Sequence, residues 1–241
     1  MAPRARMFLP PDAAAAAAAA APPPPSAFVV ALQCANIAAW SGVAFIFLPT
    51  LRSGDSPFVA TAAEKLQALF GTSGVLQPGG SVLGPDDPPL AEQRLVDLGS
   101  GDGAVVRAAS RLGGVGHCSG YETHPALVRI ARLRSAGRAN EVFHATSLWE
   151  APLADADVVT IYLLPQFLAE LAAKLSRELR DGAIIVSNAY ALPELPALVL
   201  VREVPVLTSL SQDKSSALWI YRVCRGSGQA VDAGDSDRPV R

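Results

Sequence analysis

The stretch RLVDLGSGDGAVVRAASR, from Arg94 to Arg111, decides the fold. It contains a short apolar run over Arg94–Leu98, a glycine-rich turn over Gly99–Gly103 and a helix-forming run over Ala104–Arg111. Glycines allow the backbone to turn sharply and to approach a ligand closely, and the start of a helix presents free N–H groups. The stretch therefore predicts a strand, a turn and a helix that form one side of a nucleoside-binding site.

Two carboxylates accompany this turn. Asp97 lies near the end of the first expected strand, and Glu122 follows the second expected strand, Gly116–Tyr121, where a carboxylate can accept both hydroxyls of a ribose. The spacing Gly-x-Gly-x-x-Ala from Gly99 also satisfies the dinucleotide fingerprint, so an NAD-dependent reductase stays open. Asp97 and Asp102 would repel a pyrophosphate, however, and this favours a phosphate-free, cationic cofactor, S-adenosylmethionine.

The rest of the sequence continues to alternate between strand and helix patterns. Further strands are expected over 141–145, 157–162, 183–187, 199–204 and 217–223, and further helices over 126–136 and 163–179. The last two strands have no helix between them, which predicts a closing hairpin. We therefore expect an α/β fold with a doubly wound, mostly parallel seven-stranded sheet, and a ligand at the carboxyl ends of its first two strands.

The composition excludes several classes of function. The 241 residues include 20 Lys and Arg against 22 Asp and Glu, a net charge of -2, which disfavours binding of nucleic acid through a basic surface. The cysteines, Cys34, Cys118 and Cys224, are far apart and have no histidine at ligand spacing. We expect neither a disulfide framework nor a metal site.

The N-terminal quarter differs from the remainder. Residues 1–26 are a low-complexity leader that could target the protein to an organelle. Residues 27–48 are apolar and uncharged, long enough for a membrane-anchor helix, with a buried or interfacial helix and a signal-peptide core as alternatives. Residues 49–91 predict a connecting helix and a flexible Gly/Pro-rich linker, 92–225 the catalytic domain, and 226–241 a disordered tail.

Several segments together resemble a known family. They are SPFVATAA at 56–63, VDLGSGDG at 96–103, GYETHPALVRIAR at 120–132, SLWE at 147–150, IYLLP at 161–165 and KLSRELRDGAIIVSN at 174–188. These segments are similar to the membrane-anchored mitochondrial lysine methyltransferases that modify the ATP synthase c-subunit and the adenine nucleotide translocase. The likeness covers about residues 27–223.

The resemblance implies a class I methyltransferase fold, S-adenosylmethionine as cofactor and a lysine of a membrane protein as substrate. It also implies a single-pass anchor in the mitochondrial inner membrane. The residues expected to bind the cofactor are Asp97, Gly99, Ser100, Gly101, Asp102, Gly103, Glu122, Ser147 and Leu148; those expected to act on the substrate are Tyr162 and Pro165.

This chain departs from the family pattern at three places. Ser147 replaces an aspartate expected to contact adenine, Ala104 replaces an arginine after the glycine turn, and Thr123-His124-Pro125 replaces Leu-Asn-Pro. Two further readings therefore stay open: a small-molecule methyltransferase on the same fold, and an inactive methyltransferase-like assembly factor. Tyr162-Leu-Leu-Pro165, in place of the Asn/Asp-Pro-Pro-aromatic motif of amino methylation, counts against a nucleic-acid substrate.

Overall fold

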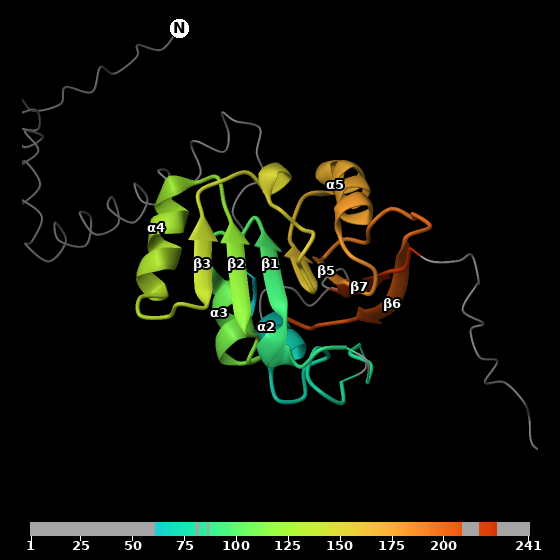
Figure 1. Ribbon diagram of the computed structural model, residues 1–241, viewed down its shortest axis with the longest axis horizontal. Coiled ribbons are helices and arrows are strands. Elements are labelled where there is room, and N and C mark those ends of the chain that lie inside the picture. The colour runs from blue at the N-terminus through green and yellow to red at the C-terminus, as the bar shows by residue number, and fades with distance from the viewer. Residues whose placement is uncertain (1–60, 81, 86, 209–216, 226–241) are drawn as a thin grey trace, which may run out of the picture. The chain divides into compact units, whose positions relative to one another are not determined.

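Seven strands form one sheet in the order β3-β2-β1-β4-β5-β7-β6 (Figure 1). The computed structural model describes residues 61–80, 82–85, 87–208 and 217–225. The strands are β1 Arg94–Leu98, β2 His117–Tyr121, β3 Glu141–His144, β4 Val158–Ile161, β5 Ile184–Asn188, β6 Leu198–Val204 and β7 Leu218–Val223. The helices are α2 Ala63–Phe70, α3 Ala104–Arg111, α4 Pro125–Arg134 and α5 Pro165–Glu178, with short 3-10 helices at Leu90–Glu92 and Leu148–Glu150.

The strand pairing confirms the expected doubly wound sheet. Strands β1 to β5 pair in parallel, and β7 is antiparallel to both β5 and β6, as the expected hairpin requires. From β1 the chain adds strands toward β3 on one side, and then returns to add β4 and β5 on the other. The strand order therefore reverses between β1 and β4, where a crevice opens at the carboxyl ends of the strands.

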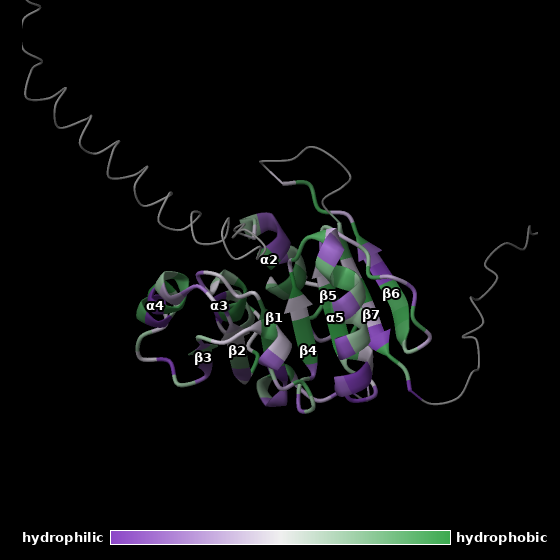
Figure 2. Cartoon of the chain, turned by 90° about the horizontal axis from the view of Figure 1, so that it is seen from above, coloured by the Kyte–Doolittle hydropathy of each residue, from purple (hydrophilic) through white to green (hydrophobic). Residues whose placement is uncertain are grey.

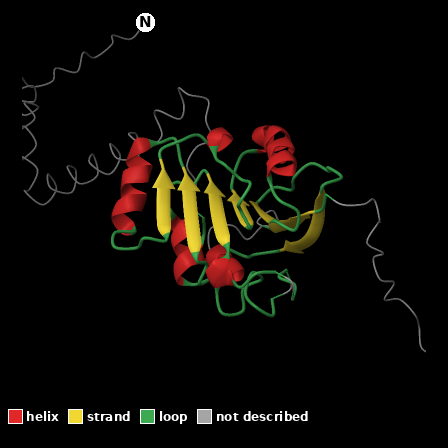
Figure 3. Ribbon diagram, in the orientation of Figure 1, coloured by secondary structure: helices red, strands yellow, loops and turns green. Residues whose placement is uncertain are grey.

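Helices cover both faces of the sheet (Figure 3). One buried cluster packs α5 against one face, through residues such as Leu171 and Leu175. A second cluster packs α2, α3 and α4 against the other face. All four residues of β4 are buried, and the central strands are hydrophobic (Figure 2), because a parallel strand covered on both faces has no side in contact with water.

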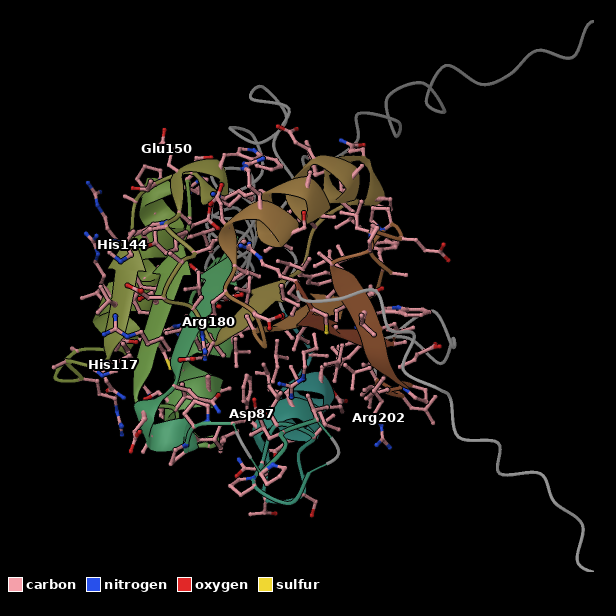
Figure 4. The ribbon with its side chains drawn as sticks, turned by 45° about the vertical axis from the view of Figure 1, so that its right-hand side comes forward. Asp87, His117, His144, Glu150, Arg180 and Arg202 are labelled. Atoms are coloured by element: carbon pink, nitrogen blue, oxygen red, sulfur yellow. The ribbon has the colours of Figure 1, made fainter. Side chains whose placement is uncertain are left out.

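The Gly/Pro-rich segment after α2 is packed against the domain, so our expectation of a flexible linker there was wrong. Leu76, Val82 and Leu90 are 2%, 4% and 8% exposed, and all belong to the cluster on the α2 side of the sheet. The carboxylate of Asp87 (Figure 4) receives two hydrogen bonds of 2.8 Å from the guanidinium of Arg222 in β7. The folded domain thus begins well before β1.

Several sequence expectations concern residues that the structure does not describe. They are the leader over 1–26, the apolar helix over 27–48, the connection over 49–60 and the tail over 226–241. Within the part of the chain that is described, no helix is both long and apolar enough to cross a bilayer. The domain boundaries drawn at these segments stay predictions.

Candidate functional site

The turn between β1 and α3 forms the floor of the site. Gly99, Gly101 and Gly103 have φ angles of 81°, 53° and 81°, a region that other residues rarely adopt. A Cβ atom at Gly103 would also lie 2.6 Å from the ring of Phe143. The backbone N–H groups of Gly99 and Ser100 both donate to the Tyr121 carbonyl at 2.9 Å, so the turn is fastened to the end of β2.

Glu122 follows β2 and connects two backbone segments. Its Oε2 accepts a hydrogen bond of 2.9 Å from the N–H of Gly101, and its Oε1 accepts one of 2.8 Å from the N–H of His124. A carboxylate oxygen has more than one lone pair, so both oxygens keep capacity to accept from a ligand. The carboxylate is therefore held in place at the rim, where a ribose could reach it.

Asp97 lies at the bottom of the site. Its side chain is buried at 5% exposure, and its Oδ1 accepts a hydrogen bond of 2.7 Å from Thr160 Oγ1 in β4. Burial raises the pKa of Asp97 to about 7, with a further increase from the nearby carboxylates of Glu122 and Asp102 and an opposing effect of the Thr160 bond. A cation bound here would stabilise the ionised form.

Asp102 has a different environment. Its carboxylate forms ion pairs with Arg107 of α3, at 3.7 Å, and with Arg134 at the end of α4. The same residue lines the cleft described next. Its charge is thus shared with two helices, and less of it is available to a ligand than the sequence alone indicates.

A cleft of about 890 Å³, open to solvent, lies where β1, β2, β4 and β5 end. The cleft brings together six of the residues at the ends of these strands and in the turns after them: Asp97, Gly99, Ser100, Glu122, Tyr162 and Asn188. Gly101 and Gly103 shape the turn beneath it without lining it.

A second cleft adjoins the first and shares Gly99 and Glu122 with it. Its remaining walls include Ser147, Leu148, Trp149 and Phe167. Ser147 Oγ accepts a bond of 3.3 Å from the N–H of Trp149, so its hydroxyl hydrogen stays available to donate. This partly aromatic cleft beside the carboxylate of Glu122 has the character of a base-binding slot.

The two residues expected to act on the substrate are not placed alike. Tyr162 directly follows β4, is half-buried and lines the first cleft. Pro165 is the first residue of α5, is exposed and lines neither of these clefts. Proline suits the first position of a helix, because the N–H that it lacks would have no partner there. The structure therefore brings Tyr162, but not Pro165, to the site.

Comparison with known proteins shows which family the chain belongs to. The family model for the ANTKMT methyltransferase domain matches residues 97–198. A mouse adenine nucleotide translocase lysine N-methyltransferase is 36% identical over 143 residues, 58% of this chain and 57% of that protein. A rat lysine N-methyltransferase of the ATP synthase c-subunit is 32% identical over 151 residues, 61% of this chain and 67% of that protein. The chain belongs to this lysine N-methyltransferase family.

Among solved structures, an RNA methyltransferase from Salinibacter ruber in complex with S-adenosyl-L-homocysteine is 30% identical, with a TM-score of 0.48. The match covers 58% of this chain and 86% of that one.

The donor set of the site fits the cofactor of the lysine N-methyltransferase family, S-adenosylmethionine. The buried Asp97 suits the cationic amino-acid portion, Glu122 suits the ribose, and the second cleft suits the adenine. Ser100 Oγ is buried and has no hydrogen-bond partner within the described residues, which leaves one polar atom of the turn unsatisfied.

Sequence reasoning missed part of the site. Thr160, Asn188, Trp149 and Phe167 line these clefts but are not among the residues expected from the sequence. The described residues contain no cluster of three or more side chains suited to a metal ion. His117 and His144, for example, lie at opposite ends of the strands β2 and β3 (Figure 4).

Proposed function

We propose that this chain transfers a methyl group from S-adenosylmethionine to the side-chain amine of a lysine in another protein. The observation that carries the proposal is the pair of carboxylates, Asp97 and Glu122, on either side of the glycine turn in a chain of the lysine N-methyltransferase family. The cofactor supplies the methyl group and a positively charged sulfur as its leaving group.

The residues of the chain would bind and orient the reactants. Asp97 and the turn would hold the amino-acid portion of the cofactor, Glu122 its ribose, and Ser147 and Leu148 its adenine. A single-step methyl transfer requires the accepting nitrogen to be in line with the bond that breaks, so most of the rate enhancement comes from positioning. These contacts fix the direction from which the amine must approach.

Tyr162 is the proposed contact for the incoming amine. Its ring lies in the wall of the first cleft, and an aromatic face attracts an ammonium or methylated ammonium group. Burial raises the pKa of Tyr162, with a smaller increase from Tyr190, so its hydroxyl stays protonated near neutral pH. It can therefore both donate and accept a hydrogen bond at the substrate.

The proposed substrate is a lysine of a mitochondrial inner-membrane protein, of the adenine nucleotide translocase or ATP synthase c-subunit type. The names of the mouse and rat relatives support this substrate class. Residues 27–48 would act as a single-pass anchor in the same membrane, because an anchor would restrict the enzyme to the surface where its substrate is found.

The test uses the purified protein, labelled S-adenosylmethionine and inner mitochondrial membranes from cells that lack this gene. We expect label on lysine peptides of one integral membrane protein, identified by mass spectrometry. Label only in the low-molecular-weight fraction would instead indicate a small-molecule methyltransferase. If calorimetry detected no binding of S-adenosylmethionine at all, the chain would be an inactive relative and the proposal would be wrong.

A further inference from the structure

A buried lysine lies at the wall of the first cleft. Lys65 of α2 is 5% exposed, and its Nζ donates a hydrogen bond of 2.5 Å to Asn188 Oδ1 at the end of β5. The same Nζ lies 5.7 Å from the centroid of the Tyr162 ring. Both partners line the cleft, as do Thr61 and Leu69, four positions before and after Lys65. The amine is therefore adjacent to Tyr162, the proposed contact for the incoming amine.

The surroundings of Lys65 favour its neutral form. Burial lowers the pKa of Lys65, and the group that accepts its hydrogen bond is a neutral amide. The carboxylates of the same cleft come from β1, β2 and the turn: Asp97 is about half protonated at pH 7, Asp102 is paired with arginines, and Glu122 accepts two backbone N–H groups. On α2 itself the acidic neighbour is Glu64. A bound sulfonium would add a positive charge that further opposes protonation.

The proposed reaction requires a proton acceptor. A lysine side chain in water has a pKa of about 10.4, so the substrate arrives as an ammonium ion without a free electron pair. It must lose one proton before its nitrogen can form a bond to carbon. A neutral amine within reach of the substrate can take that proton, whereas an ammonium or a guanidinium cannot.

We propose that Lys65 Nζ, held by Asn188 beside Tyr162, accepts the proton of the incoming lysine; this rests on the proposed function. The proton passes to Lys65 directly or through one water molecule, which leaves the substrate neutral and Lys65 charged. The freed electron pair of the substrate then forms the nitrogen–carbon bond while the sulfur–carbon bond breaks and its electrons stay on sulfur. Lys65 afterwards releases its proton to water. Asn188 is a positioning residue in this scheme.

Two substitutions distinguish a role of Lys65 as proton acceptor from a purely structural role. Lys65→Met removes the amine and keeps its approximate length; Lys65→Arg keeps a donor for Asn188 but cannot give up its proton near neutral pH. The matched control is Lys174→Arg, the same substitution at a buried lysine of α5, which bonds the Ala151 carbonyl and Glu178 on the other face of the sheet. Calorimetry checks that all variants bind S-adenosylmethionine within about threefold of the wild type.

The readout is the initial rate of label transfer into inner mitochondrial membranes, at saturating S-adenosylmethionine, as a function of pH. We expect Lys65→Met and Lys65→Arg to lower the rate at pH 7 by about a hundredfold or more. Their rates should then rise about tenfold per pH unit, as water alone deprotonates the substrate. The wild-type rate should level off once Lys65 is neutral, and Lys174→Arg should follow the wild type.

A second readout needs no cofactor and no turnover. The chain has three lysines, Lys65, Lys174 and Lys214, so ¹³C-labelled lysine gives three side-chain signals in the full-length protein. The signal that disappears in Lys65→Met is that of Lys65, and it should titrate below the ordinary lysine pKa of about 10.4.

Three results would overturn the inference: an ordinary pKa for Lys65, a wild-type rate in Lys65→Arg, or methyl label on Lys65 itself. A wild type that binds the cofactor but labels nothing would overturn the proposed function, and this inference with it. Activity retained in Lys65→Arg would overturn the inference alone.

Discussion

Glu122 holds the glycine turn and faces the cleft with the same carboxylate. We expect Glu122→Gln to weaken binding of S-adenosylmethionine by about tenfold to a hundredfold, because a hydrogen bond to a charged group contributes roughly 1.5–3 kcal/mol. Calorimetry measures the affinity, and Glu150→Gln, at an exposed carboxylate in the nearby 3-10 helix, is the control. Unchanged affinity in Glu122→Gln would refute the ribose contact.

Asp97 makes the site sensitive to pH. Its folded-state pKa of about 7 lies above its ordinary value of 3.8, so the folded protein retains a proton that the unfolded chain has lost. The contribution of this group to stability therefore falls as the pH rises from about 4 to 7 and is fully lost above it. We expect Asp97→Asn to raise the melting temperature of the ligand-free protein more at pH 8 than at pH 5, measured by calorimetry. An equal gain at both values would contradict this.

Contacts between residues far apart in the chain could not be predicted from the sequence. The sequence predicted Asp97, Glu122 and the glycines, because their spacing relative to one strand and one turn carries the signal. Lys65 and Asn188 are separated by 123 positions, and no local pattern connects them. Their contact exists because the fold brings Lys65 of α2 to the end of β5.

At the scale of elements, the turn between β1 and α3 tolerates little change. Gly103→Ala would place a methyl group 2.6 Å from the Phe143 ring and in a left-handed backbone conformation. Gly114→Ala also has a positive φ, of 71°, but nothing lies within 4 Å of its Cβ position. We expect Gly114→Ala to cost about 1–2 kcal/mol of unfolding free energy and Gly103→Ala clearly more. Urea denaturation measures both; equal losses would show that the contact with Phe143 adds nothing.

The strands and helices were predictable within one or two residues, because each is a continuous apolar or amphipathic run. β1 and α3 have the expected bounds, and α5 begins two residues later than expected, at Pro165. Pro165 is therefore the first residue of a helix, and not a residue of the substrate site as expected. A proline near a strand end fits either position, and only the three-dimensional path of the chain distinguishes them.

At the scale of the molecule, the segment before β1 completes the core. Leu76 is 2% exposed in the cluster beneath α2, and we expect Leu76→Ala to cost about 2–5 kcal/mol of unfolding free energy. The control is Leu133→Ala at a side chain that is 76% exposed, with little expected effect. Denaturant titration of the full chain compares the two. A loss of unfolding free energy below about 1 kcal/mol in Leu76→Ala would instead support a flexible linker after α2.

The flexible-linker interpretation was wrong because a high glycine and proline content indicates irregular backbone. It does not indicate whether the few apolar side chains of the segment are buried. Leu76, Val82 and Leu90 are spaced without a helical or strand period, so no periodic signal identified them. They pack in the cluster on the second face of the sheet, and Arg222 of the last strand donates a hydrogen bond to the Val82 carbonyl.

The insertion of β7 between β5 and β6 has a consequence for biosynthesis. Translation completes β5 before β6 and β7, yet the edge of β5 that faces away from β4 pairs with β7, the last strand to be made. A nascent chain that has reached β6 therefore still carries an unpaired, apolar strand edge that the finished protein hides. Such edges recruit other strands, so this intermediate is the point at which aggregation competes with folding and at which a chaperone would have the most to protect.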